Sequence, residues 1–166
     1  PWLTPADLNG FKDKNIAFGR RFITKHGLAE SSAQLLPRGS VLFSSRAPIG
    51  YVAIAGAELA TNQGFKSVVP WVPEMSEYVY VFLRSAARAI DAAASGTTFR
   101  EVSGKDVSLV PIPVPPLAEQ KRIVAKVDQL MALCGSPSTT RMPCGATTTP
   151  SRSGSWGRCA RPSGRS

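Results

Sequence analysis

The sequence has little of what metal and disulfide sites require, because its 166 residues include three cysteines and one histidine. Cys134, Cys144 and Cys159 show no C-x-x-C spacing, and His26 lies far from all three along the chain. Structural zinc sites usually take their ligands from closely spaced pairs, and a disulfide framework uses an even number of cysteines. We therefore expect no metal site and no disulfide framework.

Long apolar runs and phosphate-binding glycine motifs are also missing. A bilayer-spanning helix needs a run of about 18 apolar residues or more, and none occurs. The chain does not begin with a charged segment followed by an apolar core, as a signal peptide would. Neither G-x-x-x-x-G-K-S/T nor G-x-G-x-x-G is present. These absences predict a cytoplasmic protein with no membrane span and no nucleotide cofactor.

Groups that could perform catalysis are scarce as well. His26 lies in a polar turn at 24–27, where a surface residue is commoner than a general base. Glu119 and Lys121 resemble half of a nuclease metal site, but no aspartate follows a proline on a preceding strand, and capping of a helix start is commoner. The sequence therefore predicts a protein that is not an enzyme and needs no cofactor.

The net charge of +9 is unevenly distributed. Residues 1–134 carry 15 Lys and Arg against 11 Asp and Glu, whereas residues 135–166 carry five Arg and no acid. More than half of the excess positive charge therefore lies in the last 32 residues. The remaining mild excess is compatible with a nucleic-acid partner but does not identify one.

Short β-branched and aromatic runs predict three strands, at 41–45, 51–55 and 65–69, separated by turn-rich segments. We expect these strands to belong to one sheet. A further strand is predicted at 99–102.

A helix is predicted from 76 to 94, because apolar residues recur there at intervals of three and four. Ser76 is the expected N-cap and Gly96 lies just past the expected end. The prolines at 109–116 exclude a central strand and favour an edge strand or an extended connector. The predicted fold class is α+β, a small mixed sheet with a packed helix, followed by a projecting, coiled-coil-like helix and a disordered tail.

The second predicted helix runs from 117 to 134 and carries a seam-like apolar stripe. Spacings of four and three residues are typical of a helix that pairs with another, although packing on the parent domain would use the same stripe. The candidate residues for a partner-helix interface are Gln120, Ile123, Val124, Val127, Leu130 and Met131.

The tail at 135–166 contains no Leu, Ile, Val, Phe, Lys, Asp or Glu, so it has too little apolar area to offset the entropy of ordering. We expect it to be disordered. The abrupt change of composition at Gly135 also suggests the hypothesis of a frameshift, which translation of the other two reading frames would test.

Three loops combine hydroxyl or amide side chains with a cation and a nearby ring, at 44–46, 61–66 and 95–100. Arg reads guanine and Asn or Gln reads adenine in the major groove, while Ser, Thr and Lys commonly bind phosphate. The alternative for each loop is an ordinary turn, strand end or helix stop. The candidate DNA-binding residues are Ser44, Ser45, Arg46, Asn62, Gln63, Lys66, Thr97, Thr98 and Arg100. We expect Arg46, Lys66 and Arg100 to share one surface.

Four segments occur together in a recognisable order: SSRAPIGY at 44–51, TNQGFK at 61–66, SGTT at 95–98, and PIP followed by PPLAEQKRIV within 111–124. With PWLT at 1–4, they make the chain resemble the specificity subunit of type I restriction-modification enzymes, over residues 1–134. The PPLAEQKRI stretch is the most specific part.

The resemblance implies a target-recognition domain at 1–116, which we expect to be incomplete at its N-terminus, and the start of a helical spacer at 117–134. In that family each recognition domain reads one half of a split DNA target, and the spacers dock the methyltransferase subunits. The implied partners are therefore double-stranded DNA, methyltransferase subunits, the restriction subunit through them, and a second specificity half.

Two other functions stay open at this stage. The chain could be a fragment of a DNA methyltransferase or endonuclease, although it lacks the Asn-Pro-Pro-Tyr type of motif that holds a flipped base. It could also be a protein-interaction module that uses the 117–134 helix. We expect that helix to project from the domain rather than to fold back into the core.

Overall fold

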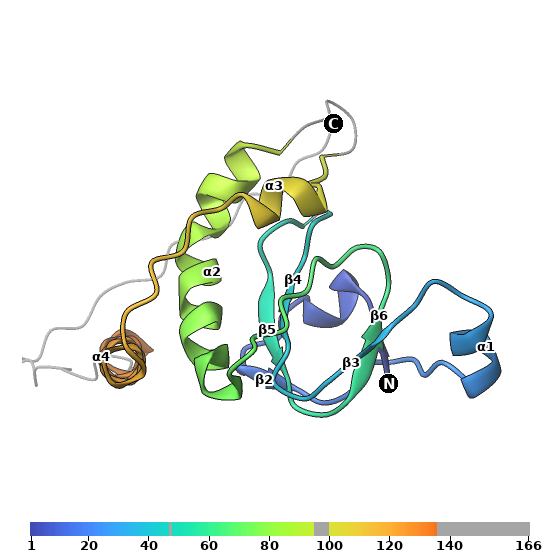
Figure 1. Ribbon diagram of the computed structural model, residues 1–166, viewed down its shortest axis with the longest axis horizontal. Helices are drawn as coiled ribbons and strands as arrows, with labels where there is room; N and C mark the ends of the chain where they lie inside the picture. Colours follow the sequence, from blue (N-terminus) through green and yellow to red (C-terminus); the bar gives the residue numbers. More distant parts are fainter. Residues whose placement is uncertain (47, 95–99, 136–166) are drawn as a thin grey trace, which may run out of the picture. The chain divides into compact units, whose positions relative to one another are not determined.

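The computed structural model describes residues 1–46, 48–94 and 100–135 of the chain (Figure 1). Its elements in chain order are β1 (Trp2–Leu3), the 3₁₀ helix η1 (Pro5–Leu8), β2 (Asn15–Ile16), α1 (Lys25–Ala29), β3 (Leu35–Leu36), β4 (Val41–Phe43), β5 (Val52–Ala55), β6 (Leu59–Thr61), the 3₁₀ helix η2 (Pro73–Met75), α2 (Ser76–Ala92), α3 (Gly104–Ser108) and α4 (Leu117–Gly135).

The centre of the domain is a sheet of order β2-β5-β4, which is buried on both faces. β2 pairs with β5 in parallel and β4 pairs with β5 antiparallel, so the sheet is mixed. Because side chains alternate along a strand, Val41 and Phe43 face α2, whereas Leu42 faces the opposite side. Burial on both faces explains why β4 and β5 are continuous apolar runs in the sequence.

A second mixed sheet, of order β1-β6-β3, covers the face of the central sheet that lies away from α2 (Figure 1). Leu3, Leu42, Leu59 and Phe65 belong to the core cluster on that side. Each such side chain contributes about 1.5–3 kcal/mol when it is fully buried. The described part of the fold therefore has three layers, sheet, sheet and helix.

The predicted first helix is confirmed as α2, but its predicted cap is wrong. The 3₁₀ helix η2 runs directly into α2, so Met75 is the N-cap and Ser76 is the first helical residue. The Ser76 hydroxyl donates to the carbonyl of Pro73 at 2.8 Å. Gly96, the expected stop, lies outside the described residues.

The three predicted strands do lie beside one another, although only two of them form regular strands. The third, at 65–69, runs antiparallel to β4 through isolated bridges at Phe65 and Val68. The predicted strand at 99–102 is reduced to a bridge between Glu101 and Arg46, and Phe99 lies outside the described residues. As expected, 109–116 contains no strand: Leu109 caps α3, and 111–116 forms a connector without regular structure.

Helix α4 forms over the predicted residues, but its first half does not project freely. Gln120 and Val124 are 3% and 7% exposed, and α4 packs against the first part of α2 (Figure 1). Its second half differs, because Leu130 and Met131 are 49% and 51% exposed. The expectation that the whole helix projects is therefore corrected for its first two turns.

Candidate nucleic-acid interface

Ser44 and Ser45, two of the predicted DNA-binding residues, are fully buried. The Ser44 hydroxyl donates to the Pro48 carbonyl at 2.8 Å and accepts from the Tyr51 N–H at 2.8 Å. The Ser45 hydroxyl donates to the Gly64 carbonyl at 3.2 Å. Both hydroxyls thus satisfy backbone groups inside the fold, and the prediction that they contact DNA is corrected.

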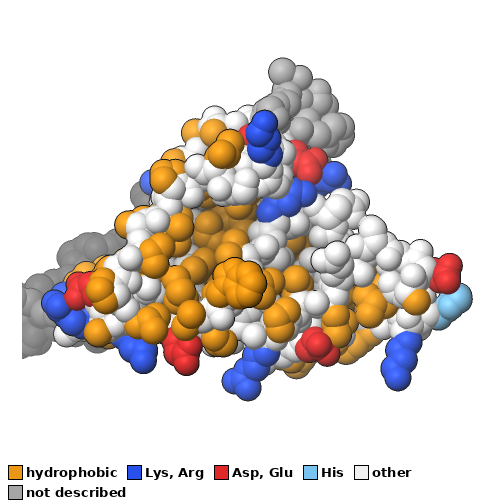
Figure 2. Space-filling model, viewed as in Figure 1, with side chains coloured by type: hydrophobic (Ala, Val, Ile, Leu, Met, Phe, Trp, Pro, Cys, Tyr) orange, Lys and Arg blue, Asp and Glu red, His pale blue; other side chains and the backbone are white. Residues whose placement is uncertain are grey.

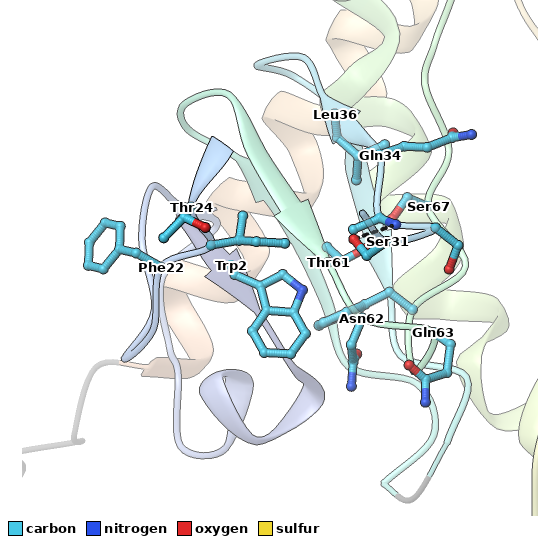
Figure 3. Close-up of a pocket in the computed structure, with 14 residues that line it drawn as sticks. Trp2, Phe22, Thr24, Ser31, Gln34, Leu36, Thr61, Asn62, Gln63 and Ser67 are labelled. Carbon is cyan, nitrogen blue, oxygen red and sulfur yellow. Dashed lines mark hydrogen bonds between the residues drawn. The ribbon is translucent and has the colours of Figure 1, made fainter. Parts of the chain in front are cut away.

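Asn62 and Gln63 follow β6 in a turn at the edge of the domain. The Asn62 Oδ1 accepts from the Gly64 N–H at 3.1 Å, which fixes the turn from within. In Figure 3 the amide ends of Asn62 and Gln63 extend to the same side of the turn. A Cβ at Gly64 would lie 2.8 Å from Pro5 Cγ, so the tight approach of this turn to η1 requires glycine. The structure brings these two predicted amides together.

Arg46 and Lys66 converge on one carboxylate. Arg46 Nε lies 2.9 Å from Glu101 Oε2, and Lys66 Nζ lies 3.7 Å from Glu101 Oε1. Lys66 Nζ also donates to the Gln63 carbonyl at 3.3 Å, which connects this group to the amide turn. The three side chains form what we call the Arg46 cluster: Arg46, Lys66 and Glu101. Its formal charge is +1.

Arg100 is held separately from the Arg46 cluster. Its guanidinium lies 3.4 Å from Asp91 Oδ1 and donates to the Asp91 carbonyl, near the end of α2. Successive residues of an extended segment point to opposite sides, so Arg100 turns towards α2 where Glu101 turns towards Arg46. Arg46 and Lys66 therefore share one ion-pair group, whereas Arg100 pairs with Asp91. The expectation that all three share one surface stays a prediction. Thr97 and Thr98 lie outside the described residues.

A groove of about 770 Å³ lies beside the amide turn (Figure 3). Trp2, Phe22 and Phe65 supply apolar walls, and Asn62 and Gln63 lie among its polar lining residues. Two buried polar atoms of the lining, Trp2 Nε1 and Ser67 Oγ, have no hydrogen-bond partner among the described residues. An indole N–H that is not paired is costly in a folded protein, by about 1–3 kcal/mol. Because both atoms are buried, neither is exposed to a ligand in the groove.

Charge on the face shown in Figure 2 is not gathered into one basic patch. Apolar side chains occupy the middle of that face, while Lys and Arg lie at its margins with Asp and Glu among them. Arg21, which stacks 4.9 Å from the ring centroid of Trp2 on the groove wall, adds a cation beside the groove. On this face, local clusters rather than a broad positive field would have to position a nucleic acid.

The predicted partner-helix residues fall into two groups. Gln120 and Val124 are buried against the domain, and Gln120 Nε2 donates to the Pro115 carbonyl at 2.8 Å. These two residues therefore stabilise the chain's own fold, which corrects their assignment to a partner interface. Ile123 and Val127 are half-buried. Leu130 and Met131 are exposed on the second half of α4.

Within residues 1–46, 48–94 and 100–135, no cluster of three or more His, Cys, Asp or Glu could hold a metal ion. No helix in the same part of the chain is long and apolar enough to cross a membrane.

Sequence reasoning did not single out Arg21, Ser67, Lys14 or Tyr78 as structurally or functionally placed residues. Trp2 was noted only within the PWLT segment, and its spacing gave no sign that its indole lines a groove. Lys14 and Tyr78 act through partners 114 and 35 residues away along the chain, so no local pattern could have revealed them.

The model of the type I restriction modification DNA specificity domain matches residues 1–136. The MjaIX type I restriction enzyme specificity subunit of Methanocaldococcus jannaschii is 40% identical over 125 residues, which are 74% of this chain and 29% of that protein. The EcoR124I/EcoR124II specificity subunit of Escherichia coli is 28% identical over 142 residues, 82% of this chain and 34% of that protein. The chain thus spans about a third of the length of these relatives.

A solved structure gives the same result for the fold. A chain in a study of complex assembly and conformational transition of the type I R-M system superposes with a TM-score of 0.51 and 30% sequence identity. The match covers 60% of this chain and 25% of that one. Specificity subunits are the non-catalytic recognition components of restriction enzymes, which agrees with the expectation from the sequence.

Proposed function

Since the chain belongs to the family of type I restriction modification DNA specificity domains, we propose that it binds double-stranded DNA and reads one half of a split target. Its site of action is then the cytoplasm, where methyltransferase subunits and, through them, a restriction subunit complete the enzyme. A second specificity half reads the other part of the target.

The observation that carries this proposal is the adjacency of an amide turn and a cation group. Asn62 and Gln63 present two amide side chains, and Lys66 connects that turn to Arg46 through Glu101. Amides pair with adenine edges in the major groove, whereas Arg and Lys pair with phosphates or with guanine. The loop at 61–66 thereby supplies groups for reading bases and for contacting the DNA backbone.

In the absence of DNA, Glu101 pairs with both Arg46 and Lys66. The side chains of Arg46 and Glu101 are 47% and 37% exposed, so their ion pair contributes only about 0–1 kcal/mol. A phosphate can displace such a weak partner. Arg21, which stacks on the Trp2 ring, extends the proposed surface along the groove.

The second half of α4 supports a role as the start of a spacer that docks methyltransferase subunits. Leu130 and Met131 are exposed there, while the preceding turns are fixed on the domain. An apolar helix end that is exposed alone gains stability when another helix covers it.

Selection of bound duplexes from a random pool tests DNA binding and identifies the half-site at once. We expect enrichment of one short sequence. Gln63→Ala should relax the preference at one position and cost about 1–3 kcal/mol, whereas Lys66→Ala should weaken all duplexes alike and reduce the salt dependence. Lys121→Ala, an exposed lysine on α4, is the matched control and should bind as the parent does.

Failure of a folded chain to bind any duplex in low salt would refute this proposal. If the folded chain then bound methyltransferase subunits, it would be an interaction module. If it instead bound the methyl donor in calorimetry, it would be a fragment of a methyltransferase.

A further inference from the structure

Helix α4 is held on the domain by polar contacts at two points along its length. At its start, Gln120 Nε2 donates to the Pro115 carbonyl, and the Tyr78 hydroxyl of α2 donates to the Pro113 carbonyl at 2.6 Å. Further along, Lys14 Nζ donates to Asp128 Oδ2 at 2.9 Å. Eight residues separate Gln120 from Asp128, which is about 12 Å along a helix.

Lys14 reaches α4 from the middle of the domain. It directly precedes β2, and its carbonyl accepts from the Ile54 N–H of β5 at 2.9 Å. Its side chain is 23% exposed, and Nζ lies 3.5 Å from Glu77 of α2 as well as 2.9 Å from Asp128. One ammonium group thus joins the central sheet, α2 and α4. We call this group the Lys14 clasp: Lys14, Glu77 and Asp128.

The clasp pairs one ammonium group with two carboxylates. Burial lowers the pKa of Lys14, but the hydrogen bond to Asp128 and the charge of Glu77 raise it by more, so the net pKa is raised. The group is therefore charged at neutral pH. Glu77 and Asp128 also line a shared groove between α2 and α4. Without Lys14, the carboxylates of Glu77 and Asp128, which lie on different helices, would lose the cation that pairs with both.

We propose that Lys14 is a positioning residue that fixes the direction in which α4 leaves the domain. Polar contacts at the start of α4 fix where the helix begins, and the apolar packing of Val124 that follows is non-directional, so neither fixes its tilt. A second contact about 12 Å further along removes that freedom. In the part of the chain that the structure describes, the Lys14 clasp is the polar contact that supplies this second point.

The consequence for DNA reading rests on the proposed function. If α4 begins a spacer, any tilt of α4 displaces a second recognition element in proportion to the length of the spacer. One base-pair step is only about 3.4 Å, so a small tilt would change the separation of half-sites that fits best. Lys14 would then contribute to target specificity without touching DNA.

The experiment measures the direction of α4 by pulsed electron spin resonance on the full chain. Spin labels are attached at Cys134, which is exposed on α4, and at Glu58→Cys, an exposed position between β5 and β6. Cys144→Ser and Cys159→Ser remove the other labelling sites. We expect one narrow distance distribution in this background.

Lys14→Met should broaden the distribution and shift its maximum, and Lys14→Arg should restore the narrow one. Lys12→Met, which removes an exposed lysine two residues away, is the matched control and should leave it unchanged. Asp128→Asn changes only the exposed end of the clasp and should broaden the distribution like Lys14→Met. This variant keeps the proposal testable if Lys14→Met does not fold.

A narrow, unshifted distribution in folded Asp128→Asn or Lys14→Met would overturn the proposal. High salt gives a second measurement, because the Debye length falls from about 10 Å at 0.1 M to about 3 Å at 1 M. Salt should therefore broaden the parent distribution and leave that of Lys14→Met as it is. No DNA is present in this experiment, so its outcome is independent of whether the chain binds a duplex.

Discussion

Replacing Glu101 by glutamine should strengthen DNA binding, although it removes two ion pairs. Glu101 is the shared partner of Arg46 and Lys66, at 2.9 and 3.7 Å. Glutamine keeps the shape of the side chain but removes its charge, so the formal charge of the Arg46 cluster rises from +1 to +2. Both cations would then be available to phosphate without first giving up a carboxylate.

The magnitude follows from the exposure of the cluster. The Arg46, Lys66 and Glu101 side chains are 47%, 26% and 37% exposed, so each ion pair contributes about 0–1 kcal/mol. The two pairs share one carboxylate and their energies do not add fully. The expected gain is about 1.4 kcal/mol at most, which is about tenfold in affinity. The salt dependence should steepen by about one unit, since one more phosphate is neutralised.

Fluorescence anisotropy of a labelled duplex, titrated at several salt concentrations, measures both quantities. Glu58→Gln is the matched control, because it removes an exposed acid with no charged partner recorded among the described residues. Equal affinity and equal salt slope in Glu101→Gln and Glu58→Gln would show that the Arg46 cluster does not face DNA.

Three further predictions concern the fold and the helix. Ser44→Ala should lower stability by about 1–3 kcal/mol in denaturant melts, because the Tyr51 N–H and the Pro48 carbonyl lose their partner, while the folded variant still binds duplex. Burial raises the pKa of Asp7, but hydrogen bonds from Thr4 and Arg20 and the charge of Arg21 together lower it by more, so the pKa lies below its usual 3.8. The contribution of Asp7 to stability is therefore present above that pH and is lost as pH falls below it. Asp7→Asn should flatten the acid limb of a pH melt. Met131→Asp should abolish association with methyltransferase subunits at unchanged melting temperature, because Met131 is exposed. Val124→Asp should lower the melting temperature, because Val124 is buried. The opposite pattern would contradict the division of α4 into a packed first half and an exposed second half.

The elements that could be predicted are those with a long or periodic pattern. β4 and β5 are apolar runs, and α2 repeats its buried residues over 17 positions, so each carries its own signal. β1, β2 and β3 have two residues each, which is too short for any periodicity. These strands form because partners far away in the chain complete their backbone hydrogen bonds, so the second sheet could not be foreseen.

The candidate site was foreseen in part, and the errors at Ser44 and Ser45 share one physical cause. Hydroxyl side chains can bind phosphate or satisfy nearby backbone groups, and the sequence does not distinguish these uses. The Ser44 hydroxyl satisfies the carbonyl of Pro48, and the Ser45 hydroxyl satisfies that of Gly64, so neither is available to DNA. Asn62 has both uses, because its Oδ1 closes the turn while its amide nitrogen points outwards.

Alternation along the segment after β4 connects the core to the proposed reading surface. Ser45 points inwards, and its backbone N–H and carbonyl pair with Gly64 and Val102 on either side. The next residue, Arg46, therefore points outwards beside Glu101. Ser45 thus fixes the segments that contain Gly64 and Val102. The exposed Arg46 can therefore change without disturbing these backbone contacts. Substitutions of the exposed Arg46 should accordingly change DNA affinity at constant melting temperature, whereas substitutions of Ser45 or Gly64 should lower the melting temperature first.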